Sequence, residues 1–182
     1  MPFNPIFSNL AGQLPLLQNA KRIIETDMKE ALEWAYGSSE SGPEYARIQY
    51  STRHSRSFPL LIIQPAGNNA GIFEQGGVDQ QHSFAVSIFL ADEDLTNDDQ
   101  AGRISLLTET LIRYYDATMM CFLSATRAQW RQNFPGAGAD QGGVKVTVRN
   151  AIYGQIAQPR EEAGVYIRSV NFELFIRLTE SR

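Results

Sequence analysis

The stretch Val165–Glu180, "VYIRSVNFELFIRLTE", decides the fold, because its apolar residues alternate with other residues and so share one face of a strand. Those alternating residues are Val170, Phe172, Leu174, Ile176 and Leu178. A second candidate strand, "VKVTVRNAIYGQIAQ" at Val144–Gln158, precedes it, with Gly154 as a candidate bulge. The intervening "PREEAG" is a turn sequence. The pair predicts a long C-terminal β-hairpin.

This hairpin is long for a chain of 182 residues. An arm of about 15 residues at ~3.3 Å each spans about 50 Å, more than the ~30 Å width of a small domain. We therefore expect the tip to protrude and to expose strand edges. Soluble proteins cover or pair such edges, and a second copy of the chain is the simplest cover.

Upstream of the hairpin, two amphipathic helices and three strands are expected. Pro15 and Gly37 bound the first helix, whose apolar positions recur at three- and four-residue steps: Leu17, Ala20, Ile24, Met28, Ala31 and Ala35. The second helix follows Thr96 or Asn97 and carries one apolar side: Ile104, Leu107, Leu111, Tyr115, Thr118 and Phe122. The strands are "YARIQYS", "FPLLIIQP", which is apolar on both faces, and "HSFAVSIFLAD".

These elements predict an α+β fold: a mostly antiparallel sheet flanked by two main helices and closed by the long C-terminal hairpin. Residues 1–14 are expected to form an N-terminal arm, and residues 15–182 a single domain. Between the second and third strands, Ala66–Gln81 is rich in Gly, Asn and Gln. We expect a long loop or a loose hairpin there.

Composition narrows the function classes. The net charge of −4 and the pI near 5.2 argue against a nucleic-acid-binding module. Cys121 has no second cysteine to pair with, and its place in an amphipathic helix favours a buried small hydrophobe. No run approaches the ~18 apolar residues of a membrane helix, and the N-terminus is a poor signal peptide. We expect a soluble protein in the cytosol.

No catalytic constellation is visible in the sequence, so we expect no enzyme, no cofactor and no bound metal. The glycine-rich stretch Pro135–Gly143 lies between a helix and a strand and lacks the spacing of a phosphate-binding motif. His54 and His82 have no partner spacing and are expected on surface turns. The acidic run Asp92–Asp99 lacks the glycine of a calcium loop and indicates a solvated helix start.

The layout resembles the tail terminator and tail completion proteins of tailed bacteriophages. The resemblance rests on "AKRIIETDMKEALEWAYG", "FPLLIIQP", the strand–helix stretch His82–Asp116 and the closing "GVYIRSVNFELFIRLTE". It implies a virion protein, assembled in the host cytoplasm, that forms a hexameric ring at the tail end or neck. The implied partners are further copies of the chain, the tail tube protein and the head connector. DNA would pass through the lumen only as cargo.

Polarity and lack of periodicity give the candidate interface residues: Phe3, Ile6, Phe7, Arg53, Arg56, Asn68, Asn69, Phe73, Asp140, Gln141, Arg160 and Glu161. Two alternative functions stay open. One is another phage tail part, such as a tube, neck or baseplate subunit. The other is a small-ligand-binding or enzymatic domain that uses Ala66–Gln81 as a lid.

Overall fold

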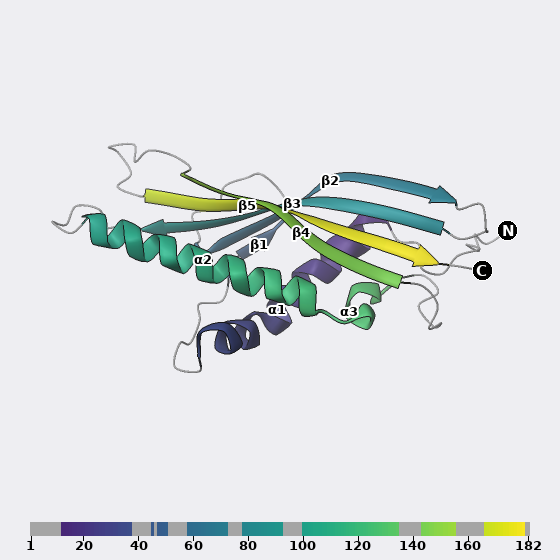
Figure 1. Cartoon of the computed structure of the whole chain (residues 1–182), viewed down its shortest axis with the longest axis horizontal. Coiled ribbons are helices and arrows are strands. Elements are labelled where there is room, and N and C mark those ends of the chain that lie inside the picture. Colours follow the sequence, from purple (N-terminus) through teal and green to yellow (C-terminus); the bar gives the residue numbers. More distant parts are fainter. Residues whose placement is uncertain are drawn as a thin grey trace.

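A computed structural model describes residues 12–37, 45, 47–50, 58–72, 78–92, 100–134, 143–155 and 166–180. The elements in chain order are α1 (Gln13–Tyr36), β1 (Arg47–Gln49), β2 (Leu60–Ile72), β3 (Val78–Asp92), α2 (Gln100–Ser124), α3 (Arg127–Arg131), β4 (Gly143–Gln155) and β5 (Tyr166–Glu180). The mixed α+β class and the mostly antiparallel sheet are confirmed. Figure 1 shows an elongated molecule in which the sheet lies above the helices.

The strands of the described residues form one sheet in the order β1-β2-β3-β5-β4. Only β1 and β2 run parallel, while every other neighbouring pair is antiparallel. β4 and β5 pair as the predicted C-terminal hairpin. However, β3 pairs with β5 from one end to the other, from Val78–Glu180 to Asp92–Tyr166. β3 accompanies β5 over its whole length, so the described part of β5 does not protrude from the sheet. The tip of the hairpin, at 156–165, lies outside the described residues, and its protrusion stays a prediction.

Two strands contain a register shift. In β4 the shift lies between Arg149 and Ile152, where Asn150 has φ 57°, a left-handed conformation that asparagine tolerates. Gly154, the predicted bulge, instead pairs regularly with Ser169. In β2 the shift follows Pro65, which has no amide hydrogen for the ladder. The strand continues to Ile72 instead of ending at this proline.

The predicted loop or loose hairpin at 66–81 is a hairpin. Residues 67–72 of β2 pair with residues 78–83 of β3, so the polar stretch extends the sheet despite its low strand propensity. Pairing with β5 on the other side of β3 supplies the tertiary support that the sequence pattern lacks. Residues 73–77 lie outside the described part of the chain.

Both long helices follow their predicted periodicity. α1 begins at Gln13, and Gly37 ends it at φ 92° with its amide donating to the Glu33 carbonyl oxygen. α2 stops at Ser124, before the predicted helical region ends. Thr126 then starts α3 with a reciprocal capping box to Gln129.

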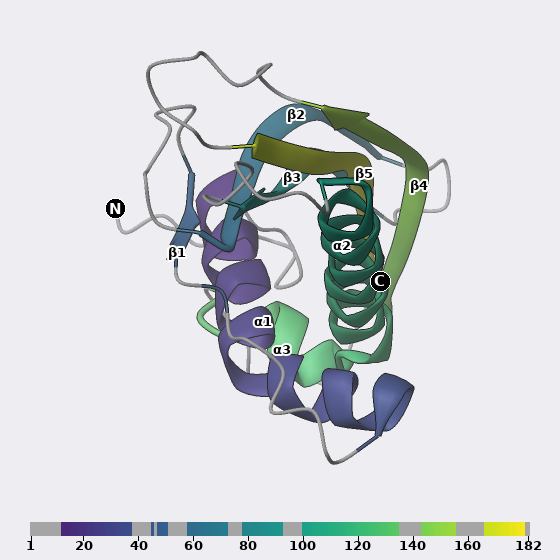
Figure 2. The same cartoon turned by 90° about the vertical axis from the view of Figure 1, so that its left-hand side faces the viewer.

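α1 and α2 cover one face of the sheet, as the view along the molecule shows (Figure 2). Alternate residues of β2, β3 and β5 meet the helices there in one core. Its largest fully buried side chains include Trp130, Tyr114, Phe84, Phe122, Leu16, Ile23, Ile24, Ile63, Ile88 and Leu111. On the opposite face, Leu60, Ile62 and Phe89 form a second small cluster. The prediction that this stretch of β2 is apolar on both faces is confirmed.

Candidate assembly interface

The sheet has two outer edges. At one edge β1 pairs only with Leu60–Ile62 of β2, and β4 forms the other edge. Among the described residues no strand pairs with the other side of this 13-residue strand. Proteins usually shorten, charge or cover a strand edge of this length. Beyond the register shift, Ile152 is 64% exposed and Tyr153 is 46% exposed. The edge is therefore long, open and partly apolar.

β4 also carries positive charge on the face turned away from the helices. Lys145 and Arg149 pair across the hairpin with Arg177 and Glu173, on the face opposite the core. Arg177 is held by Asp79 in a bidentate contact at 2.7–3.0 Å. This contact raises the pKa of Arg177 through the hydrogen bond first and the carboxylate charge second.

The Arg149 guanidinium lies over the ring of Phe175, 5.1 Å from its centroid. This cation–π contact orients the charge without neutralising it. Ile152 lies on the same face as Arg149, because their partners on β5, Asn171 and Glu173, are two residues apart. We call the outward side chains of Lys145, Arg149 and Ile152 the β4 edge surface.

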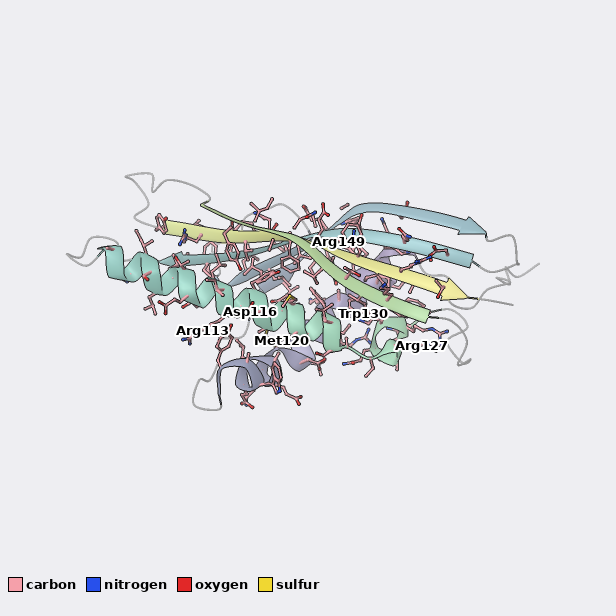
Figure 3. All side chains as sticks on the ribbon, in the orientation of Figure 1. Arg113, Asp116, Met120, Arg127, Trp130 and Arg149 are labelled. Carbon is pink, nitrogen blue, oxygen red and sulfur yellow. The ribbon has the colours of Figure 1, made fainter. Side chains whose placement is uncertain are left out.

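A second exposed feature is a groove of about 570 Å³ between the C-terminal half of α1 and the end of α2. We call it the α1–α2 groove, and its lining residues are Asp27, Glu30, Ala31, Trp34, Met120, Cys121, Ser124 and Gln129. Trp34 is 79% exposed, the largest exposed fraction among the big apolar side chains of the described residues. Figure 3 shows Met120 and Asp116 on the side of α2 that faces α1.

The α1–α2 groove continues a buried face of α1. Ile23 is buried in the core, and Asp27, Glu30 and Trp34 follow it at steps of four, three and four residues, on the same side of the helix. The first turns of this side lie against α3, where Gln129 donates to Asp27 at 2.9 Å. α3 runs antiparallel to α1 and begins only at Arg127, level with Asp27, so the C-terminal half of α1 extends past the start of α3.

Asn19 fixes α3 against α1. Its side-chain amide is fully buried and donates to the carbonyl oxygens of Trp130 and Gln132, at 2.6 and 3.0 Å. Arg22 donates to the side-chain oxygen of Asn19. These bonds satisfy carbonyls at the end of a short helix that has no further turn to satisfy them. They therefore hold the carboxyl end of α3 against the N-terminal half of α1.

Cys121 is buried at the floor of the α1–α2 groove. Burial raises the pKa of the Cys121 thiol to about 12, and the nearby Asp27 carboxylate adds to the rise. A thiol with so high a pKa is a poor nucleophile at neutral pH. The expectation of a buried, hydrophobe-like cysteine is confirmed. Of its neighbours, Phe122 belongs to the core and Met120 lines the groove.

Beyond the groove, Tyr36 closes the end of α1. Its hydroxyl donates to Asp116 at 2.6 Å, and Arg113 lies 5.3 Å from the centre of its ring. Burial, followed by this hydrogen bond, raises the pKa of Tyr36 to about 12. The contact ties the C-terminal end of α1 to the middle of α2.

The prediction of His82 on a surface turn is wrong. Its side chain is 1% exposed and stacks on Phe84, with ring centroids 6.3 Å apart. β3 starts four residues before it, and the alternation of the strand turns His82 toward the core. His54 and most of the acidic run lie outside the described part of the chain.

Only two of the predicted interface residues lie in the described part of the chain. Asn68 and Asn69 belong to the extension of β2 and pair with His82 and Gln81. The others lie outside the described residues: Phe3, Ile6, Phe7, Arg53, Arg56, Phe73, Asp140, Gln141, Arg160 and Glu161. The structure thus leaves those positions as predictions, and it adds Glu30, Trp34, Arg149 and Ile152, which sequence reasoning missed.

The described parts of 66–81 are paired strand, so in those parts the lid hypothesis does not hold. Of the glycine-rich stretch, only Gly143 is described, and it opens β4 opposite Thr179. Within the described residues, no group of three His, Cys, Asp or Glu side chains has the geometry of a metal site. No helix in that part of the chain is long and apolar enough to cross a membrane.

Comparisons with known proteins do not assign this chain to a family. No protein-family model matches the chain, and no curated protein matches it in sequence. Among solved structures, a chain described as "Virion of native gene transfer agent (GTA) particle" is similar over 89% of this chain and 94% of its own length. Its TM-score is 0.43 at 10% sequence identity. A likeness at this level identifies neither a family nor a function for this chain.

Proposed function

We propose that the chain is a structural virion protein whose copies join through the open β4 side of the sheet into a ring at the end of a phage tail. The observation that carries the proposal is the open β4 edge, 13 residues long and bordered by the exposed Ile152 and Tyr153. A strand edge of this kind is a template for pairing with another chain. A closed ring gives every copy the same partner and leaves no edge exposed.

The elongated sheet further supports a role in assembly. Three neighbouring strands, β3, β5 and β4, run side by side for 13 to 15 residues (Figure 1). The helices cover one face, and the outer side of β4 stays available along the whole strand. The tail terminator family, which the sequence layout resembles, consists of ring subunits that cap the tail tube and present a surface to the head connector.

The alternative of a different tail component, such as a tube or baseplate subunit, shares the same edge and differs in how the copies stack. A stacking subunit forms filaments or extended tubes, whereas a terminator forms closed rings of fixed size. The number of copies in the assembly and its closure separate the two.

The test is the mass of the purified chain by light scattering at several concentrations, with negative-stain images of the same samples. We expect a concentration-dependent shift from the 20.4 kDa chain to a discrete ring of about six copies. Filaments would favour the tube alternative. A strict monomer at every concentration would contradict self-assembly through an open edge.

A further inference from the structure

The α1–α2 groove and the β4 edge surface are two unpartnered surfaces of opposite charge on the described part of one chain. Glu30 lines the groove and forms no ion pair among the described residues. Arg149 is exposed. Its guanidinium lies over the uncharged ring of Phe175, and the residue opposite it in the hairpin is Glu173. Each surface places a large apolar side chain beside its charge: Trp34 in the groove and Ile152 on the strand.

The spacing within the two surfaces matches. Glu30 and Trp34 are one helical turn apart, about 6 Å along α1. Arg149 and Ile152 face β5 residues two positions apart, which is about 7 Å along the strand. A strand laid along the groove can therefore bring an acid–base pair and an aromatic–aliphatic pair together at the same time.

We propose that the β4 edge surface of one copy docks in the α1–α2 groove of a second copy, with Arg149 facing Glu30 and Ile152 packed on Trp34. This inference rests on the proposed self-assembly and names its contact. The contact is heterologous, because the two sides are different parts of the chain, and contacts of this type generate rings or filaments. The exposed Trp34 is the expected hot spot, since tryptophan is enriched among the residues that dominate interface energy.

The test exchanges charges between copies. Glu30→Arg alone and Arg149→Glu alone each put like charges across the contact, so each variant should assemble at least tenfold more weakly than the wild-type chain. An equimolar mixture should recover assembly. In a ring in which the two variants alternate, there are two kinds of contact. At one, the β4 edge surface changed by Arg149→Glu meets the groove changed by Glu30→Arg. At the other, the native Arg149 meets the native Glu30.

Glu109→Arg is the matched control, because it makes the same charge change on an exposed α2 residue outside the groove. It should assemble like the wild-type chain. Circular dichroism of the three variants checks that they fold, which we expect because all three side chains lie on the surface or at the open groove.

A photo-crosslinking amino acid at position 34 gives a second readout that does not depend on charge. Crosslinks formed in the assembled protein should map to residues 143–155 of a different copy. Three results would overturn this contact while leaving ring formation intact. Both charge variants could assemble as well as the wild-type chain, the mixture could fail to recover assembly, or the crosslinks could map to other segments. A wild-type chain that never assembles would overturn both proposals.

Discussion

The same side of α1 is buried in the N-terminal half of the helix and largely uncovered in the C-terminal half. In the N-terminal half, Leu16 and Ile23 are buried, and Asn19 ties α3 across the side. In the C-terminal half, Asp27, Glu30 and Trp34 continue that side, but only Gln129 reaches it from α3. The spacing of residues on this side of α1 continues into the C-terminal half, but α3 covers only the N-terminal half. We therefore infer that the C-terminal half binds a partner outside the chain.

The largest expected effect falls on the covered half. Ile23→Ala should lower the free energy of unfolding by about 2–5 kcal/mol, because it leaves a cavity among tightly packed core residues. Urea denaturation of the monomeric protein measures the loss. A loss below about 1 kcal/mol would mean that this half of α1 is not fixed against the core as described.

Alkaline pH tests whether the groove floor is dry. The folded-state pKa of Cys121, about 12, lies above its ordinary value of 9.0, so the contribution of the neutral thiol to stability is present below about pH 9 and is lost as the pH rises toward 12. A shift of this size corresponds to a few kcal/mol, at about 1.4 kcal/mol per unit. Tyr36, with its pKa also raised to about 12, acts in the same direction from pH 10 upward.

The measurement is urea denaturation at pH 8, 9, 10 and 11 for the wild-type chain and for Cys121→Ala. Stability should fall with rising pH above about pH 9, and the fall should be shallower in the variant. Equal slopes would mean that water reaches the thiol and that the groove floor is wet.

Asn19→Ala should lower the free energy of unfolding by about 1–3 kcal/mol, because the carbonyl oxygens of Trp130 and Gln132 lose their buried hydrogen-bond donor. The loss should be accompanied by faster amide exchange in α3, which this side chain holds in place. If amide exchange in α3 stays unchanged, Asn19 does not hold α3 against α1.

The smallest effect on the isolated chain is expected in the uncovered half. Trp34→Ala should change the free energy of unfolding of the monomer by less than about 0.5 kcal/mol, because the side chain is 79% exposed. The same substitution should weaken assembly by tenfold or more. A large loss of monomer stability would place Trp34 in the core and remove the contrast between the two halves.

The sequence predicts what depends on local periodicity. The alternate residues from Val170 to Leu178 face the core, as the sequence predicts, and so does the apolar side of α2. The strand structure of the polar stretch 66–81 is harder to predict from the sequence. Residues 67–72 of β2 pair with β3, and β3 pairs with β5, whereas the local strand propensity is low. The sequence pattern places His82 at the start of a strand, on the surface. The strand begins four residues earlier, at Val78, so His82 lies inside it and faces the core.

The candidate interface could be read only in part from the sequence. Trp34 lies 11 residues after Ile23, so periodicity places it on the buried side of α1, and only the short length of α3 leaves it exposed. One sequence signal for the β4 edge surface was available. The consecutive apolar residues Ile152 and Tyr153 break the alternation of the strand just after Asn150 and so indicate a shift of register.

Hydrogen–deuterium exchange of the wild-type chain, measured in dilute and in concentrated solution, tests the central claim most directly. The outward amides of β4 should exchange quickly in the dilute protein and become protected on concentration, together with residues 27–36 of α1. Residues 16–24 should show equal protection at both concentrations. Protection that does not depend on concentration in both segments would contradict assembly through the β4 edge and the α1–α2 groove.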